Sequence, residues 1–163
     1  MNESHIVDLL KSTGCLVEGQ VEGTDEQGGW VAGAMEPLAN PTAVSELAGC
    51  LSEALPTPAP DLIAAWPGLD NIVLAFAIGV QMDKPVVLLS DAEGLVTASG
   101  NVEANESVAL VGVTLSERDA NLARAFVENK GGKLAVSASL VGVGQVTGEL
   151  SLVTVEVGVD GND

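Results

Sequence analysis

The residues that could do chemistry in this chain are few, and most of them are carboxylates. Asp91 and Glu93, and again Glu103 and Glu106, lie close together in one polar stretch. Their oxygens are the ligands that a hard cation prefers. The chain carries 23 Asp and Glu residues, however, so chance clusters of solvated acids are expected and we predict no metal site here.

Nucleophilic and imidazole chemistry has even less support. His5 is the single histidine, so the sequence offers no credible Ser-His-Asp or Cys-His arrangement and no imidazole metal site. Cys15 and Cys50 lack the C-x-x-C spacing of a metal or redox motif. We expect both to pack in the core, and we predict no catalytic residue of these types.

Two further segments have the residue types of ligand-binding loops. Trp66-Pro67-Gly68 is either a plain turn, with the indole packed over the strand ends, or a surface on which a base could stack if the ring is exposed. An aromatic residue before proline also raises the chance of a cis peptide bond. The run from Gly142 to Gly148 lacks dinucleotide-loop spacing, and the segment after it alternates like a strand, so we expect a glycine-rich hairpin.

Composition limits the classes of partner. Six Lys and Arg residues against 23 Asp and Glu residues give a net charge of −17. Such a charge repels phosphate backbones and anionic membranes, and six scattered cations cannot build a basic patch. We therefore expect no nucleic-acid and no membrane partner. The acidity fits either a saline habitat or simple solubility.

Length and hydropathy allow one ordinary domain. A chain of 163 residues, 47% of them hydrophobic, can bury a core without disulfide support. The N-terminal residues 1–5 lack the basic region of a secretory signal, and the longest apolar run, residues 72–80, is about half a membrane span. We expect a cytoplasmic protein.

The N-terminal part is predicted to form a helix and an antiparallel pair of strands that we call the hood. Apolar spacing indicates a short helix over Ser4–Lys11 that ends at Gly14. The hood strands are expected at residues 15–22 and 29–35, with a polar, glycine-rich loop at 23–29 between them.

A longer helix is predicted after the hood. Asn40 supplies a cap and Pro41 a proline at the first helical position, and the helix runs to about Leu55. Its apolar residues share one face: Val44, Leu47, Ala48 and Leu51. A proline cluster at residues 56–60 ends the helix and serves as a connector within the domain.

The rest of the chain alternates between strand and helix. Strands are expected at residues 61–65, 85–90, 107–113 and 133–141, with a last, alternating edge strand at 150–157. One helix is predicted from a cap at Asp70 through Gln81, with its apolar face formed by Val73, Phe76, Ala77 and Val80. Another follows a cap at Ser116 and ends at Gly131-Gly132, with its apolar face formed by Leu122, Ala123, Phe126 and Val127.

Two such β-α-β units predict an α/β fold with a mainly parallel sheet flanked by helices on both faces, plus the small antiparallel hood. We divide the single domain into a helix and hood (residues 1–40), an α/β core (41–141) and an edge strand with a tail (142–163). In open α/β sheets ligands bind beyond the carboxyl ends of the strands. The candidate loops are therefore residues 66–69, 91–106 and 112–116.

The order of these elements resembles the type I phosphoribosyltransferases, and among them the orotate branch. The segments that look like that branch's hood strands, first helix and pyrophosphate loop are residues 14–21, 30–35, 40–41 and 61–68. The likeness spans about residues 14–141. It implies a phosphoribosyltransferase fold in which backbone amides of the loop at Trp66, Pro67 and Gly68 would contact pyrophosphate.

The defining signature of that family is an apolar strand, two adjacent acids, and a Thr/Ser and glycine-rich turn that opens a helix. The resemblance implies that the acids hold the ribose hydroxyls of phosphoribosyl pyrophosphate and that the turn's amides hold its 5′-phosphate. Here Gly112 and Val113 stand at the positions of the acids, so neither side chain can accept a hydrogen bond from a hydroxyl. Residues 117–119, Glu-Arg-Asp, replace the small residues of the phosphate-binding turn after Thr114 and Ser116.

The start of the last helix is also predicted to be occupied by its own side chains. Ser116 and Asp119 have the spacing of a capping box, which satisfies the backbone amides that a phosphate would otherwise bind. A dianionic phosphate would also meet Glu117 and Asp119, with only Arg118 to offset them. The stretch 91–106, which corresponds to the family's basic catalytic loop, contains no Lys or Arg.

The sequence thus predicts a diverged phosphoribosyltransferase-like protein that is catalytically inactive and has a binding or regulatory role. The remnant substrate pocket would comprise Trp66, Pro67, Gly68, Gly112, Val113, Thr114 and Ser116. An alternative is an active transferase of nucleotide salvage or pyrimidine synthesis, which would use magnesium and a basic residue from a partner subunit. No other cofactor is expected.

Two kinds of partner are expected. One is a small molecule at the carboxyl ends of the strands. The other is a second copy of the chain, because resembled proteins commonly form dimers through the hood and first helix. A third reading is a structural companion of an active enzyme. An exposed apolar patch at Val44, Leu47 and Leu51 would favour such an assembly.

Overall fold

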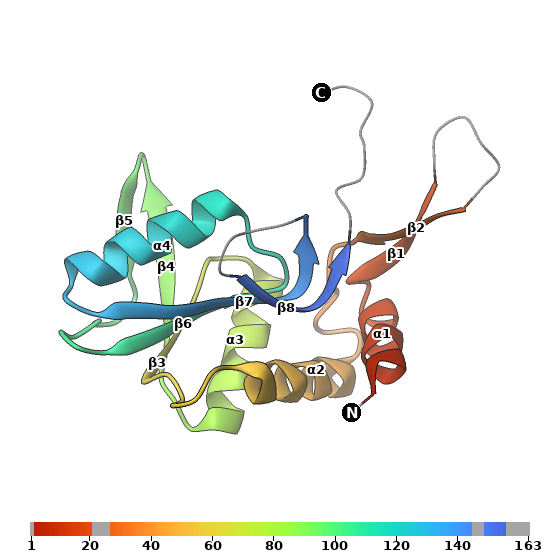
Figure 1. Ribbon diagram of the computed structural model, residues 1–163, viewed down its shortest axis with the longest axis horizontal. Coiled ribbons are helices and arrows are strands. Elements are labelled where there is room, and N and C mark those ends of the chain that lie inside the picture. Colours follow the sequence, from red (N-terminus) through yellow and green to blue (C-terminus); the bar gives the residue numbers. More distant parts are fainter. Residues whose placement is uncertain (1, 21–26, 145–148, 156–163) are drawn as a thin grey trace.

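The computed structural model describes residues 2–20, 27–144 and 149–155, and its centre is a six-stranded sheet (Figure 1). The elements in chain order are α1 (Glu3–Ser12), β1 (Leu16–Gln20), β2 (Gln27–Ala32), α2 (Pro41–Ala54), β3 (Leu62–Ala65), α3 (Leu69–Met82), β4 (Val86–Ala92), β5 (Leu95–Ala98), β6 (Ser107–Gly112), α4 (Glu117–Asn129), β7 (Lys133–Val143) and β8 (Glu149–Val155). None of the described helices is long and apolar enough to cross a membrane.

The sheet is mainly parallel, as predicted. Its strand order is β5-β4-β3-β6-β7-β8, and every neighbouring pair is parallel except β4 and β5. The last strand is an edge strand, also as predicted. Because β8 runs parallel to β7, these two strands do not form a hairpin, and the predicted glycine-rich hairpin is wrong; residues 145–148 lie outside the described part of the chain.

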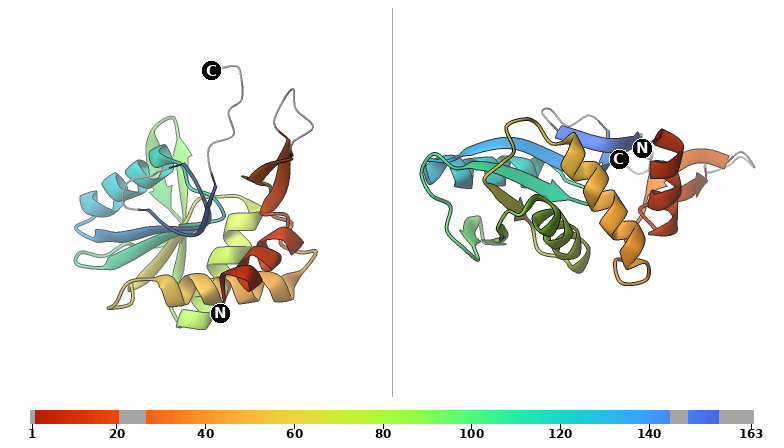
Figure 2. Two further views of the ribbon diagram at one scale, coloured as in Figure 1. Left: turned by 45° about the vertical axis from the view of Figure 1, so that its right-hand side comes forward. Right: turned by 90° about the horizontal axis from the view of Figure 1, so that it is seen from below.

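Helices cover both faces of the sheet, with α2 and α3 on one face and α4 on the other (Figures 1 and 2). Successive residues of β3 point to opposite faces: Ile63 and Ala65 join the buried cluster under α2 and α3. Leu62 and Ala64 join the cluster under α4. A strand buried on both faces needs a continuous apolar run, which is what made β3 and β6 recognisable.

The hood is an antiparallel pair, β1 and β2, that lies with α1 at one end of the sheet (Figure 2). Further backbone bonds continue the pairing toward the core, since Gly33 donates to the Cys15 carbonyl and Glu36 to the Thr13 carbonyl. The predicted loop at 23–29 is shorter at one end, because β2 begins at Gln27; residues 21–26 lie outside the described ranges.

Helix α2 forms as its sequence predicts. The Asn40 side chain accepts a hydrogen bond from the Ala43 amide, and Pro41 is the first helical residue. The predicted apolar face is fully internal: Val44, Leu47, Ala48 and Leu51 are at most 2% exposed. The exposed patch at Val44, Leu47 and Leu51 that would have favoured a structural companion of an enzyme is therefore not found, because α3 and α1 pack against this helix.

Helix α3 corrects two predictions. Its N-cap is Gly68 rather than Asp70, whose carboxylate instead accepts from the adjacent Asn71 amide inside the first turn. The predicted apolar face is also wrong, because Phe76 and Val80 are 68% and 64% exposed. Nearly the whole helix is apolar, so periodicity alone could not select the buried side. It buries the following residues: Leu74, Ala75, Ile78 and Gly79.

Strand β5 was not predicted. The sequence predicts a loop at residues 91–106, yet β4 extends to Ala92 and the chain turns back as β5 after two residues. Those two residues, Glu93 and Gly94, both have positive φ (54° and 85°), which is the requirement of a tight hairpin turn. A Glu-Gly pair is a weaker hairpin signal than Asn-Gly, so the sequence alone does not predict this turn.

Candidate functional site

The loops after β3 and β6 meet at one edge of the sheet, because Ala64 of β3 pairs with Leu110 of β6 in parallel register. Two hydrogen bonds join the segments beyond the strand ends. The Val113 amide donates to Asn71 Oδ1 at 3.0 Å, and Trp66 Nε1 donates to the Asp119 carbonyl at 3.2 Å. The structure therefore brings together the residues that the sequence nominated as a remnant substrate pocket.

Trp66 packs inside this edge instead of facing solvent. It is 7% exposed and belongs to the buried cluster that also contains Leu115 and Ala120. Its one polar atom is used by the Asp119 carbonyl. The interpretation that a base stacks on this ring is thus wrong, and Trp66-Pro67-Gly68 is a plain turn with the indole packed over the strand ends. The Trp66–Pro67 bond is trans, since the described residues contain a cis peptide bond only at Thr57–Pro58.

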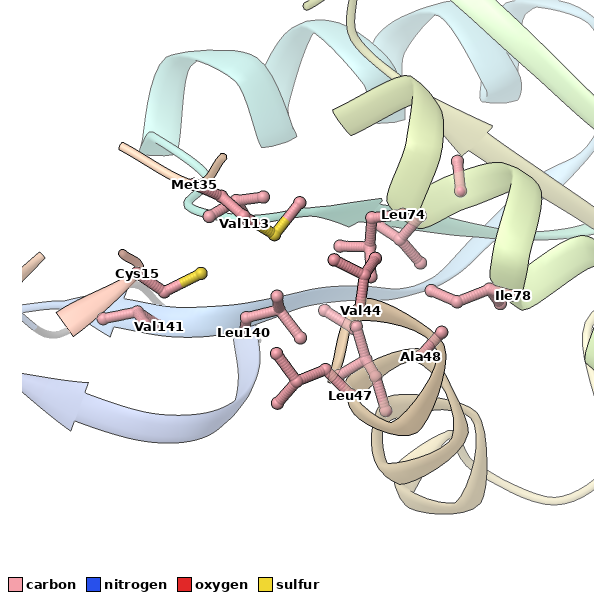
Figure 3. Close-up of a cluster of buried hydrophobic side chains, with 14 of the residues drawn as sticks. Cys15, Met35, Val44, Leu47, Ala48, Leu74, Ile78, Val113, Leu140 and Val141 are labelled. Atoms are coloured by element: carbon pink, nitrogen blue, oxygen red, sulfur yellow. The ribbon is translucent and has the colours of Figure 1, made fainter. Parts of the chain in front are cut away.

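The end of β6 is filled by apolar groups. Val113 is 3% exposed and lies in one buried cluster with Met35 and Cys15 of the hood side and Val141 of β7 (Figure 3). Its backbone is also engaged, because its amide donates to Asn71 Oδ1 and its carbonyl accepts from the Val141 amide. At Gly112 a Cβ atom would come within 2.7 Å of Leu115 Cδ2. The Val113 side chain is therefore excluded from solvent, and a side chain at position 112 would collide with Leu115.

The first turn of α4 carries its own cap. Ser116 Oγ accepts from the Asp119 amide at 3.0 Å, as the sequence predicted. The reciprocal half of a capping box, an Asp119 carboxylate bonded to the Ser116 amide, is not formed among the described residues, so that part of the prediction is wrong. Glu117 and Asp119 still place two carboxylates in this turn.

Two of the four acids in residues 91–106 accept hydrogen bonds from within the protein. Asp91 Oδ1 accepts from the Gly94 amide and Oδ2 accepts from Arg118 Nη2 at 2.9 Å. Glu106 Oε1 accepts from the Glu103 amide at 2.8 Å. In the described part of the chain no three His, Cys, Asp or Glu side chains are grouped to hold a metal ion.

The Asp91–Arg118 pair was missed by sequence reasoning. Its partners are far apart in the chain, and only the unpredicted hairpin brings Asp91 to the start of α4. The ion pair matters because Arg118 is the one cation in the turn that could have offset a bound phosphate. It is instead directed to a carboxylate of the protein.

Both cysteines are inert groups of the core. Cys15 and Cys50 are buried, and burial raises the pKa of each thiol, so both stay protonated at neutral pH. Thr13 Oγ1 donates to Cys15 Sγ, which fixes the thiol within the hood-side cluster.

Of the seven nominated residues, four face solvent: Pro67, Gly68, Thr114 and Ser116. Trp66, Gly112 and Val113 are buried. The exposed rim of this edge thus offers two hydroxyls and the backbone of a turn. Residues 112 and 113 at the end of β6 carry no carboxylate, and the cation in the first turn of α4, Arg118, is paired with Asp91.

No family model matches the sequence, and no curated protein is similar to it. Solved structures do match. Adenine phosphoribosyltransferase from Leishmania tarentolae is 16% identical, with a TM-score of 0.66 over 97% of this chain and 90% of that one. Orotate phosphoribosyltransferase from Aeropyrum pernix is 14% identical, with a TM-score of 0.71 over 92% and 93% of the two chains.

A third match is the orotate phosphoribosyltransferase from Mycobacterium tuberculosis, 15% identical, with a TM-score of 0.63 over 93% of this chain and 95% of that chain. Identities this low show the fold alone. The chain has a type I phosphoribosyltransferase-like fold: a mostly parallel sheet flanked by helices, with a small antiparallel hood, as the sequence predicted.

Proposed function

We propose that this chain keeps the phosphoribosyltransferase scaffold without its reaction and has a binding or regulatory role. The observation that carries the proposal is Val113. In the resembled family this position and its neighbour supply acids to the ribose hydroxyls. Here Val113 is 3% exposed among apolar side chains, and its amide is bound by Asn71.

The phosphate position supports the same conclusion. A helix N-terminus favours an anion by roughly 0.3 to 1 kcal/mol. At α4 the Ser116 hydroxyl already accepts the Asp119 amide, and the carboxylates of Glu117 and Asp119 repel a dianion. Repulsion from two nearby negative charges outweighs so small a gain.

The pyrophosphate side lacks compensating charge. Residues 91–106 contain no Lys or Arg, and Arg118 bonds Asp91 at 2.9 Å. Departure of pyrophosphate builds negative charge that must be stabilised by preorganised cations or donors. Magnesium would have no carboxylate at residues 112–113 to orient it, so the residues present do not fit this ion and no step is assigned to it.

Titration calorimetry with phosphoribosyl pyrophosphate and magnesium chloride tests the proposal. We expect only heats of dilution with ligand at about 1 mM, since a dissociation constant above that value corresponds to less than about 4 kcal/mol of binding. An active orotate phosphoribosyltransferase titrated in parallel is the positive control. Micromolar affinity in this chain would overturn the proposal.

The binding role concerns a small molecule at the exposed rim. Thr114 and Ser116, with the turn at Pro67-Gly68, are the accessible groups beside the carboxyl ends of β3 and β6. Native mass spectrometry of protein purified without added ligands, followed by a crystal structure, is the test. A co-purified molecule located at this rim supports the role; a molecule found only elsewhere contradicts it.

The second candidate is an active nucleotide-biosynthesis or salvage transferase, favoured by the coverage of more than nine-tenths of both chains in the match to the Aeropyrum pernix enzyme. It requires release of pyrophosphate from phosphoribosyl pyrophosphate and a nucleobase, with a basic residue brought from a partner subunit. A panel of purine and pyrimidine bases at high protein concentration decides it: turnover favours this candidate, and its absence across the panel removes it.

A further inference from the structure

A cavity lies between helix α4 and residues 96–103, the segment that contains most of β5 and the chain after it. Figure 1 shows β5 beside α4. The volume is about 430 Å³, near the lower end of the ~300–1,000 Å³ range of small-molecule sites. Lys130 on its helical wall is roughly 20 Å along α4 from the Ser116 cap, so this cavity lies apart from the rim of the candidate site.

Hydrogen bonds hold the wall formed by residues 96–103 in place. The Ser99 amide donates to the Leu88 carbonyl, and Ser99 Oγ accepts from the Leu88 amide, so the segment follows the outer edge of β4. Just beyond the cavity, the Asn105 amide donates to the Gly131 carbonyl at the end of α4. Because the segment is tied to the fold on both sides, the cavity has fixed walls.

One end of the cavity carries two opposite charges. Glu103 and Lys130 both line it, and the Asn105–Gly131 bond brings their two chain segments together. Both side chains are exposed, and among the described residues neither forms an ion pair. The Lys130 ammonium lies 5.6 Å from the centroid of the Phe126 ring. A ligand with adjacent anionic and cationic groups can therefore pair with both charges.

The remaining walls are mainly apolar. Val96, Ala98 and Val102 come from the 96–103 segment, and Phe126 comes from α4. All four belong to the buried cluster under α4 or pack against it. Phe126 is half-buried and is one of only four aromatic residues in the chain. These walls suit an apolar group attached to the charged head of a ligand.

We propose that this cavity binds a free α-amino acid with an apolar side chain. The ligand's carboxylate pairs with Lys130 and its ammonium with Glu103. Its side chain lies against Val96, Val102 and Phe126. The site does not depend on the chemistry of the candidate site, so it goes beyond the function proposed above.

The net charge of the protein favours a zwitterion over an anion. The chain carries a charge of −17, which repels phosphate esters and dicarboxylates as they approach. An amino acid has no net charge and avoids this repulsion. In the cavity its two ionised groups each form a charge-assisted hydrogen bond, the stronger kind of such bonds. A ligand that lacks either group gives up one of them.

Titration calorimetry of the full chain with single amino acids gives the first test. The panel is L-alanine, L-valine, L-leucine, L-isoleucine, L-methionine and L-phenylalanine. We expect at least one to bind with a dissociation constant below about 1 mM, and alanine to bind most weakly because it buries the least apolar surface. If none binds below about 1 mM, the proposal is overturned.

Derivatives of the tightest ligand test the need for both charges. Its carboxamide lacks the anionic group and its N-acetyl form lacks the cationic group. Each should bind at least about tenfold more weakly than the free amino acid. An N-acetyl form that binds equally well would show an anion site, and a carboxamide that binds equally well would show a cation site. Either result contradicts the proposal.

Variants locate the site. Lys130→Gln and Glu103→Gln should each weaken binding of the free amino acid at least about tenfold. Lys133→Gln and Glu128→Gln are the matched controls, because they make the same charge changes at exposed positions outside the cavity and should leave the affinity unchanged. Circular dichroism melting confirms that each variant folds. If the controls weaken binding equally, or the two cavity variants bind normally, the amino acid lies elsewhere.

Combining variants with derivatives tests the orientation of the ligand. The N-acetyl form has no ammonium to lose, so Glu103→Gln should not weaken its binding, whereas Lys130→Gln should. The carboxamide should show the reverse pattern. If the two patterns are exchanged, the ligand does not lie in the proposed orientation. Binding of phosphoribosyl pyrophosphate is read in a separate titration, so failure of the proposed function and failure of this site are distinguishable.

Discussion

At the scale of single residues, Val113 is the position at which this chain keeps the fold of the resembled family but lacks the acid that would bind the ribose hydroxyls. An acid at the end of a central strand is tolerated where water and a ligand surround it. Val113 instead packs with Met35, Cys15 and Val141, and its amide and carbonyl are both bonded within the protein. A carboxylate in this place would be buried without a partner, which is costly.

Val113→Asp should therefore lower the free energy of unfolding by about 3 kcal/mol or more, the range of a buried, unpaired charge. Thr114→Asp is the control, because Thr114 is exposed and the change should stay within about 0.5 kcal/mol. Urea unfolding measures both. If Val113→Asp is as mild as Thr114→Asp, the end of β6 is open to water and the proposed loss of the site is wrong.

At the scale of elements, local signals decided what could be predicted. Asn40 and Ser116 are N-caps whose side-chain oxygens accept a hydrogen bond from the amide three residues later, so both helix starts follow from nearby residues alone. The face of α3 could not be predicted, because an almost uniformly apolar helix is buried on whichever side its neighbours lie. Gly79 illustrates how a neighbour selects the buried side: a Cβ atom added at this position would come within 2.9 Å of the Lys84 carbonyl oxygen.

The candidate site likewise has features that the sequence predicts and contacts that it does not. The missing acids at residues 112–113 are visible in the sequence, because they are a matter of residue type. The Asn71–Val113 bond, the Trp66–Asp119 bond and the Asp91–Arg118 pair join residues between 27 and 53 positions apart. Such contacts depend on tertiary packing, so the periodicity of the sequence does not predict them.

The β7–β8 edge gives a prediction for an element. Ser139 Oγ donates to Glu149 Oε1 at 2.5 Å. Burial raises the pKa of Glu149 above its ordinary 4.5, and the Ser139 bond lowers it by less. The folded protein thus holds this proton more tightly than the unfolded chain. The contribution of Glu149 to stability is fullest below pH 4.5 and declines as pH rises through the raised pKa.

Glu149→Gln should consequently raise the free energy of unfolding at neutral pH, and the gain should shrink toward zero as pH falls to 4.5. The Gln carbonyl can still accept the Ser139 hydroxyl. Urea unfolding over a pH series measures the gain, with Glu128→Gln on exposed α4 surface correcting for the loss of one negative charge. If Glu149→Gln raises the free energy of unfolding no more than Glu128→Gln does, or if its gain grows as pH falls, burial of the Glu149 carboxylate does not cost stability as predicted.

At the scale of the whole molecule, charge sets the conditions under which the fold is stable. Twenty-three acids against six cations give strong self-repulsion in the compact state. Arg118 pairs with Asp91, and His5 bonds Glu46, but these contacts involve two of the 23 acids, so they offset little of this repulsion. Screening by salt is therefore expected to favour the folded state.

Thermal melts at neutral pH should show this directly. Raising potassium chloride from about 0.1 to about 1 M should increase the melting temperature by about 2–4 °C or more, equal to roughly 1 kcal/mol for a chain of this size. The same series near pH 4.1, where the net charge vanishes, is the control and should show a smaller increase. Equal increases at both pH values would mean that self-repulsion is not the cause.

The central claim is that the protein's own groups occupy the positions that a sugar phosphate needs. Backbone amide NMR of the labelled full chain, titrated with phosphoribosyl pyrophosphate and magnesium chloride, reads those positions one by one. The account predicts no saturable shift of the Val113 amide or of the amides of residues 114–119. A saturating, stoichiometric shift of these resonances would contradict it.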